Sequence, residues 1–237
     1  MEAVLPLRRI IVLCVLLGAI VFGLLSWRDW DPSSRRQVGQ PAVPVIDKQP
    51  VVFASRAFDP TAPPADMPPL ASGEEAECTS DFVSNAIVGG VSRQTDATHA
   101  TVTITKIKMT LQLSITIWAP AGASAHVIEH EEGHRQIAEY YYQTADKLAE
   151  RIAATSMGKQ VAISGADLSA ESSKMLQQMA MELTEEYDKE LNPGPTQLLY
   201  DAITDHSRNE VVVKDAIAAA IANNPNGATQ PATNPGN

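Results

Sequence analysis

The segment Ile107–Ile117, IKMTLQLSITI, carries the clearest pattern in the chain. Apolar side chains occupy every second position, and lysine, threonine, glutamine or serine lies between them. A period of two is typical of a β-strand that buries one face. Val102 and Ile104 have the opposite phase, so we expect a turn or bulge near Thr105–Lys106. The pattern predicts a strand or hairpin over residues 100–117.

Helical patterns follow this strand. Apolar residues at three- and four-residue spacing predict a long helix over residues 124–155. We expect a short strand at Val161–Ser164 and a second helix that begins near Asp167 or Ser169 and ends before Pro193. The remaining segment is rich in alanine and is also predicted to be helical. The predicted fold class is therefore α+β, with antiparallel strands followed by a long helix and further helices.

The first 30 residues predict a membrane anchor. Residues 10–25 are uncharged and strongly apolar, and with the next two residues they form a run of 18 residues. As a helix this run is about 27 Å long, close to the ~30 Å of a bilayer core. Arg8 and Arg9 precede it, and no small-residue cleavage motif follows it. We predict that residues 1–30 are an uncleaved signal anchor in the cytoplasmic membrane, with the following domain outside, in the periplasm.

Two further segments have compositions that do not favour a packed core. Nine prolines fall within residues 31–77, which predicts a semi-rigid linker with local edge strands at Val43–Ile46 and Val51–Phe53. Residues 223–237 have no apolar side chain larger than alanine, which predicts a disordered tail. Residues 78–222 are left as one domain of ordinary size.

Composition excludes several classes of protein. The formal net charge of -10 argues against a nucleic-acid-binding protein and against charge-driven adhesion to anionic lipid. The two cysteines exclude a scaffold held together by many disulfides. The sequence leaves the oligomeric state open.

Residues 130–134, HEEGH, match the H-E-x-x-H pattern inside the predicted helix. His130 and His134 are four residues apart and share one helix face, so both imidazoles can bind one ion. Glu131 is then placed to take a proton from a metal-bound water, as the general base. The pattern predicts a Zn²⁺ site. Gly133 destabilises a helix by about 1 kcal/mol relative to alanine. Its presence indicates either that another backbone segment passes close to the helix or that the helix simply tolerates a glycine here.

A third protein ligand is expected for zinc. Helical periodicity around Leu183 favours Glu190, although the acidic residues nearby are also typical of a solvated face. Asp205 and His206 are more remote candidates. His126 lies one turn before the motif, and we expect it at the rim of the site or on the surface rather than among the ligands.

The chain also resembles a bacterial family of unknown function, described as predicted secreted zinc-dependent proteases. The resemblance covers about residues 100–200. It is carried by Ile117-Trp118-Ala119-Pro120, by His130-Glu131-x-x-His134-x-x-Ile137-Ala138, and by Tyr187-Asp188-x-Glu190 with Gln197. It implies a zincin-like metallopeptidase domain and, by the position of its aspartate, Asp188 as the third zinc ligand. The family pattern continues with a His-Gly pair, where this chain has Pro193-Gly194.

Together these observations predict a membrane-anchored peptidase that acts outside the cytoplasm on a peptide or protein substrate. His130, His134 and Asp188 are expected to bind Zn²⁺, with Glu190 as the alternative third ligand, and Glu131 is expected to activate water.

Tyr187 or His206 is expected to donate a hydrogen bond to the oxyanion. An extended substrate is expected to pair with an exposed edge of the 107–117 strand. The alternatives are a zinc-binding envelope scaffold without catalysis and, less favoured, a metallohydrolase that cleaves another bond.

Overall fold

The computed structural model describes residues 43–70 and 73–224. The predicted anchor over residues 1–30 and all but the first two residues of the predicted tail over 223–237 lie outside the described residues. Among the described helices, none has the length and apolarity needed to cross a membrane.

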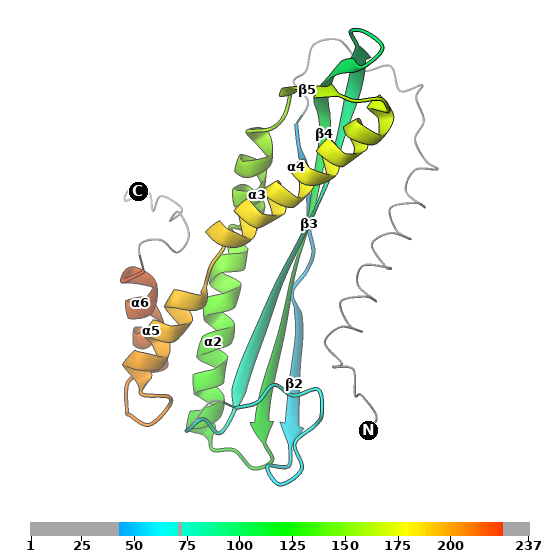
Figure 1. Cartoon of the computed structure of the whole chain (residues 1–237). Coiled ribbons are helices and arrows are strands. Elements are labelled where there is room, and N and C mark those ends of the chain that lie inside the picture. Colours follow the sequence, from blue (N-terminus) through cyan, green and yellow to red (C-terminus); the bar gives the residue numbers. More distant parts are fainter. Residues whose placement is uncertain (1–42, 71–72, 225–237) are drawn as a thin grey trace, which may run out of the picture. The chain divides into compact units, whose positions relative to one another are not determined.

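The centre of the fold is the long strand β4 (His99–Pro120), which confirms the strand predicted from the alternation. On one edge it pairs with the antiparallel strand β3 (Glu77–Gln94). On the other edge it pairs with β5 (Gln160–Ser164), which is antiparallel, and with β1 (Val45–Lys48) and β2 (Val52–Phe58), which are parallel. The expectation of an antiparallel sheet is therefore corrected to a mixed sheet. Figure 1 shows β3 and β4 as one long twisted ribbon.

A change of register explains the phase change near the start of β4. Gly89 pairs with Lys106, but the next residue, Gly90, pairs with Ile104. One extra residue on β4 is accommodated there, as in a β-bulge, and it reverses which side chains face the core. The bulge predicted near Thr105–Lys106 is confirmed.

The edge strands expected at Val43–Ile46 and Val51–Phe53, within the predicted linker over residues 31–77, are found as β1 and β2. Both strands belong to the same compact unit as the helices. Pro44 precedes β1 and Pro50 lies between the two strands, where neither proline removes a hydrogen bond of a central strand. The dense prolines therefore mark strand ends, and the folded domain begins well before residue 78.

The single helix predicted over residues 124–155 is two helices in the structure. Helix α2 (Ala125–Gln143) begins after Ser124, whose side chain accepts a hydrogen bond from the backbone N–H of Val127. Thr144 then leaves the helical conformation, with φ −103° and ψ 7°, and α3 (Ala145–Ala154) follows.

The later helices agree with the sequence pattern. Helix α4 (Leu168–Glu190) is capped by Asp167, as predicted, and ends before Pro193. Helices α5 (Gly194–Thr204) and α6 (Val213–Ala222) complete the described part of the chain.

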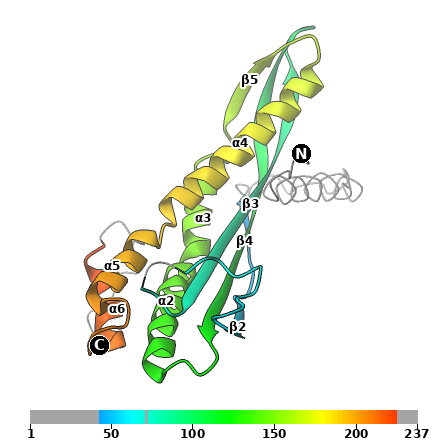
Figure 2. The ribbon, with the colours of Figure 1, turned by 60° about the horizontal axis from the view of Figure 1, so that its bottom comes forward.

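Helices α2, α3 and α4 pack on the sheet, with α4 crossing the β3–β4 ribbon at an angle, and α5 and α6 pack on α2 (Figures 1 and 2). The alternating apolar residues of β4, from Ile107 to Ile117, are at most 3% exposed. Burial of this row against α2 and α3 makes the core, since apolar area removed from water stabilises the fold by roughly 25 cal/mol per Å². The same packing holds the first half of α2 close to the start of β3 and to α5, where the candidate site lies.

Candidate metal centre

His130 and His134 lie one turn apart on α2 and point to the same place, as predicted. Their Nε2 atoms are 3.3 Å apart, and their rings are nearly perpendicular. His130 is 5% exposed, so the pair belongs to an interior site rather than to the solvent-facing side of the helix.

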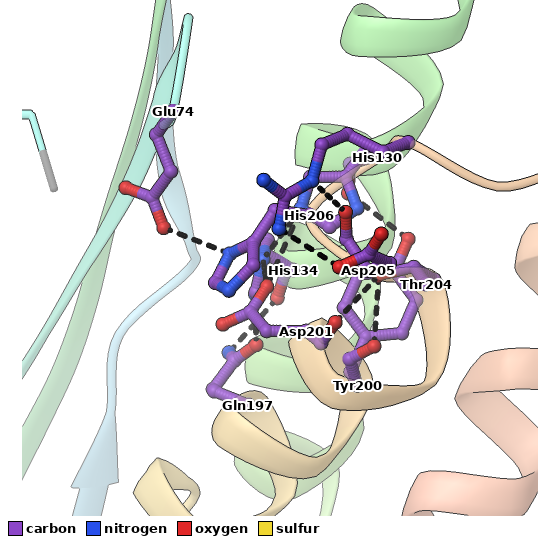
Figure 3. A network of polar contacts seen from close by, with 10 residues as sticks. Glu74, His130, His134, Gln197, Tyr200, Asp201, Thr204, Asp205 and His206 are labelled. Carbon is purple, nitrogen blue, oxygen red and sulfur yellow. Dashed lines mark hydrogen bonds and ion pairs between the residues drawn. The ribbon is translucent and has the colours of Figure 1, made fainter. Parts of the chain in front are cut away.

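The third group at this place is Asp201, on α5. Its Oδ1 lies 2.8 Å from Nε2 of His134 and 3.3 Å from Nε2 of His130. One ligand atom from each of the three residues lies within 4.8 Å of the other two, so the group could hold a metal ion. Figure 3 shows the two histidines on α2 and the aspartate reaching them from α5.

Asp188, the ligand implied by the family resemblance, is not in this cluster. It is exposed on α4 and accepts a hydrogen bond from the hydroxyl of Ser84 on β3, at 2.7 Å. The alternative, Glu190, is also exposed and forms an ion pair with Arg151. The structure brings Asp201 to the histidines in place of these two residues, because α4 packs on β3, β4, β5 and α3, whereas α5 packs directly on α2.

A signal for Asp201 is present in the sequence of α5, although the H-E-x-x-H pattern does not include it. Gln197, Tyr200, Asp201 and Thr204 recur at three- and four-residue spacing and therefore share one face of α5. Polar and aromatic residues on the face of an otherwise apolar helix indicate a buried polar site.

Gln197 and Tyr200 hold the histidines in place. Gln197 Oε1 lies 2.6 Å from Nδ1 of His134, and its amide donates to the backbone carbonyl of His134 at 3.1 Å. This contact favours the tautomer in which Nδ1 of His134 carries the proton and Nε2 faces Asp201. The ring of Tyr200 stacks on His130, and its hydroxyl donates to the carbonyl of His130 at 3.1 Å.

Gly133 is explained by Tyr200. A Cβ atom at this position would lie 2.1 Å from Oη and 2.5 Å from Cζ of the Tyr200 side chain, which is fully buried. The sequence suggested either a backbone that passes closely or simple tolerance. The structure instead shows an aromatic side chain of α5 pressed against the helix.

Glu131 lines the same pocket, which has a volume of about 150 Å³. Burial raises the pKa of Glu131 to about 7; His134 opposes this shift, and Glu77, Glu74 and Asp201 add to it. A carboxyl group with a pKa near neutrality can both accept and release a proton at physiological pH. The start of β3 forms the opposite wall of the pocket and contributes Glu77, Cys78 and Ser80.

Asp201 and His134 behave as an oppositely charged pair. Burial acts to raise the pKa of Asp201, but its close contacts with the imidazoles of His130 and His134 hold the pKa well below its usual range. Burial acts to lower the pKa of His134, and the contacts with Asp201 and Gln197 outweigh it and raise the value. Asp201 is therefore an anion that faces the two Nε2 atoms.

The three groups fit a zinc ion in chemistry and spacing. Two imidazole nitrogens and one carboxylate oxygen are a common catalytic zinc ligand set. Two ligands about 2.0–2.1 Å from a tetrahedral ion lie about 3.3–3.4 Å apart. Two of the three distances in this cluster are 3.3 Å. The third is the 2.8 Å contact between His134 and Asp201, a hydrogen-bond distance that a bound ion would lengthen.

The other predicted residues lie elsewhere. Tyr187 is 1% exposed within the main apolar core and does not line the pocket, so its predicted role at the oxyanion is not supported by its position. His126 is half-buried in the first turn of α2, outside the pocket lining. Asp205 forms an ion pair with Arg208, and His206 lies beside Glu74 at the edge of the site.

Comparison of the chain with models of protein families, with curated proteins and with solved structures finds no match. The resemblance to the predicted secreted zinc-dependent proteases stays a prediction.

Proposed function

We propose that the protein is a zinc-dependent hydrolase whose substrate is a peptide. One observation carries the proposal: His130, His134 and Asp201 converge on one point, with Glu131 in the same pocket. The zincin-like interpretation is part of this proposal. It is supported by the H-E-x-x-H helix and by the third ligand group, the carboxylate of Asp201, which comes from a later helix.

Each residue has a separate role in this proposal. His130, His134 and Asp201 would hold the zinc, which as a Lewis acid polarises a carbonyl group and brings the pKa of bound water near 7. Glu131 would accept the proton of that water and donate it to the leaving amine, for which a pKa of about 7 is suited. Gln197 would keep Nδ1 of His134 protonated, so that Nε2 is available.

The strand edge to which a peptide substrate could add is on β3, not on the 107–117 strand as predicted. Both edges of β4 are already paired, because β1 and β2 occupy the edge opposite β3 over residues 108–111 and 114–120. In the described part of the chain, β3 pairs with β4 alone and has its other edge unpaired. Glu77, Cys78 and Ser80 of β3 line the pocket, so an extended peptide would add to β3 there.

The test is zinc content and peptide hydrolysis of the full-length protein. We expect zinc bound tightly by His130, His134 and Asp201, cleavage of an unstructured protein such as casein, and loss of cleavage after chelation. Glu131→Gln should keep the zinc and lose at least a hundredfold in kcat. Glu129→Gln, an exposed substitution on the same helix, is the matched control and should be fully active.

Two results would contradict parts of the proposal. Equal activity in Glu131→Gln would rule out the general-base role. Zinc bound at the centre without hydrolysis of any peptide would favour the scaffold alternative. We further propose, on the sequence alone, that residues 1–30 anchor the domain outside the cytoplasmic membrane; protease accessibility of the domain in intact cells would test the orientation.

A further inference from the structure

A second group of metal-ligating side chains adjoins the first. Glu74 lies in the segment before β3, and His206 follows α5. Glu74 Oε1 is 3.2 Å from Nδ1 of His206, and Figure 3 shows this contact beside Asp201. One ligand atom from each of Glu74, Asp201 and His206 lies within 4.8 Å of the others. Asp201 therefore belongs to both groups.

The imidazole of His206 has a buried ring nitrogen in a position suited to bind a metal ion. Its Nδ1 is buried and makes no hydrogen bond within the described residues, although the Glu74 carboxylate lies in front of it. Buried polar atoms without a hydrogen bond are uncommon and point to an unseen water or ion. The atom faces the Glu74 carboxylate, so a cation held between the two side chains would give this nitrogen a partner.

The negative charge of the pocket also favours the binding of more than one cation. Four carboxylates line it, and no lysine or arginine does. They belong to Glu74, Glu77, Glu131 and Asp201. One divalent ion at the histidines would leave a formal charge of −2 if all four were ionised. Buried like charges without compensation are costly.

We propose that Glu74, Asp201 and His206 bind a second divalent metal ion, so that the pocket is a two-metal centre bridged by Asp201. The inference rests on the proposed function, because the first ion occupies the site formed by His130, His134 and Asp201. Two ions about 3.5–4 Å apart are held by a shared ligand in many hydrolases, where they bind two oxygens of the reacting group. Mixed imidazole and carboxylate ligands suit Zn²⁺, Co²⁺ or Mn²⁺.

The experiment is a metal titration of the full-length protein after removal of metals by chelation. With Co²⁺ as the probe, we expect two ions per chain by equilibrium dialysis. The electron paramagnetic resonance signal per cobalt should fall when the second site fills, since a bridging carboxylate couples the two ions. His206→Ala and Glu74→Gln should each bind one ion, with an uncoupled signal. Glu129→Gln is the control and should bind two.

The outcomes separate this inference from the proposed function. One ion in the wild-type protein, lost in His134→Ala and kept in His206→Ala, would overturn the two-metal centre and leave the first site in place. Two ions with independent signals would also overturn it. No bound ion in the wild-type protein would defeat both. His206 and Glu74 are 36% and 19% exposed in their side chains, so their variants should keep the core, which circular dichroism would verify.

Discussion

Gly133→Ala should destabilise the protein, although the same change in an ordinary helix is stabilising. Alanine gains about 0.8–1 kcal/mol over glycine inside a helix. Here the added Cβ would lie 2.1 Å from Oη and 2.5 Å from Cζ of Tyr200. Tyr200 is fully buried, so it has no free space into which to move. Overpacking of this kind costs about 1–3 kcal/mol, and loss of the Tyr200 hydrogen bond to His130 adds about 0.5–1.5 kcal/mol.

The net expectation is a loss of about 1–3 kcal/mol in the free energy of unfolding, together with weaker zinc binding. Tyr200 is adjacent to Asp201 in the chain, so a displaced ring moves the carboxylate away from the two histidines. We expect zinc affinity to fall at least tenfold, or about 1.4 kcal/mol.

Urea unfolding of the metal-free protein measures the stability change without the contribution of the ion. Gln136→Ala, exposed on the same helix, is the matched control and should change stability by less than about 0.5 kcal/mol. Tyr200→Phe removes only the closest contact, so the double variant Gly133→Ala/Tyr200→Phe should lose less stability than the two single variants summed. A Gly133→Ala protein as stable as the wild type, or more stable, would refute this account of the α2–α5 contact.

Four variants probe the ligands and their surroundings. Asp201→Asn should abolish tight zinc binding, whereas Asp188→Asn should keep the wild-type zinc content by elemental analysis; the reverse result would restore the ligand that the resemblance implies. Gln197→Leu should weaken zinc binding about 10–100-fold, because His134 loses the partner that fixes its tautomer, and unchanged affinity in a competition titration would show that this contact is dispensable. In the metal-free protein, the folded-state pKa of Glu131 is about 7, above the ordinary glutamate value of about 4.5, so the folded state binds more protons in this window and stability should fall as pH rises from about 4.5 to 7. Glu131→Gln should reduce this pH-dependent loss of the free energy of unfolding by up to about 3 kcal/mol, as measured by urea unfolding at several pH values. The same pH dependence of stability in the wild type and the variant would contradict the burial of this carboxyl group.

The parts of the fold predicted from sequence are those with strict periodicity. The alternation in β4 and its phase change are local properties, and both are found in the structure. β3 has no such alternation, because Val83 and Ile87 are apolar yet about half exposed, and Gly89–Gly90 interrupts the pattern. Such a strand cannot be predicted from its own sequence pattern and is identified only by its pairing with β4.

The candidate site also combines residues that a local sequence pattern predicts with a residue that only tertiary packing brings into place. His130, Glu131 and His134 come from one helix, so a spacing rule places them together. Asp201 comes from another helix, and its approach depends on how α5 packs on α2, which no local pattern states. The resemblance selected Asp188 by position in a motif, but α4 carries that residue against Ser84 on β3 instead.

The packing of α5 on α2 therefore determines whether the site exists. Gln197, Tyr200 and Asp201 lie on one face of α5, and each contacts His130 or His134. Rotation of α5 by one residue would turn this face by about 100° and remove all three contacts at once. Because zinc binding requires Asp201 in place, the ion should stabilise the docked position of α5. Hydrogen exchange should show greater protection of residues 194–204 with zinc than without it, and less change in β4; equal protection in both states would mean that α5 is docked independently of the metal.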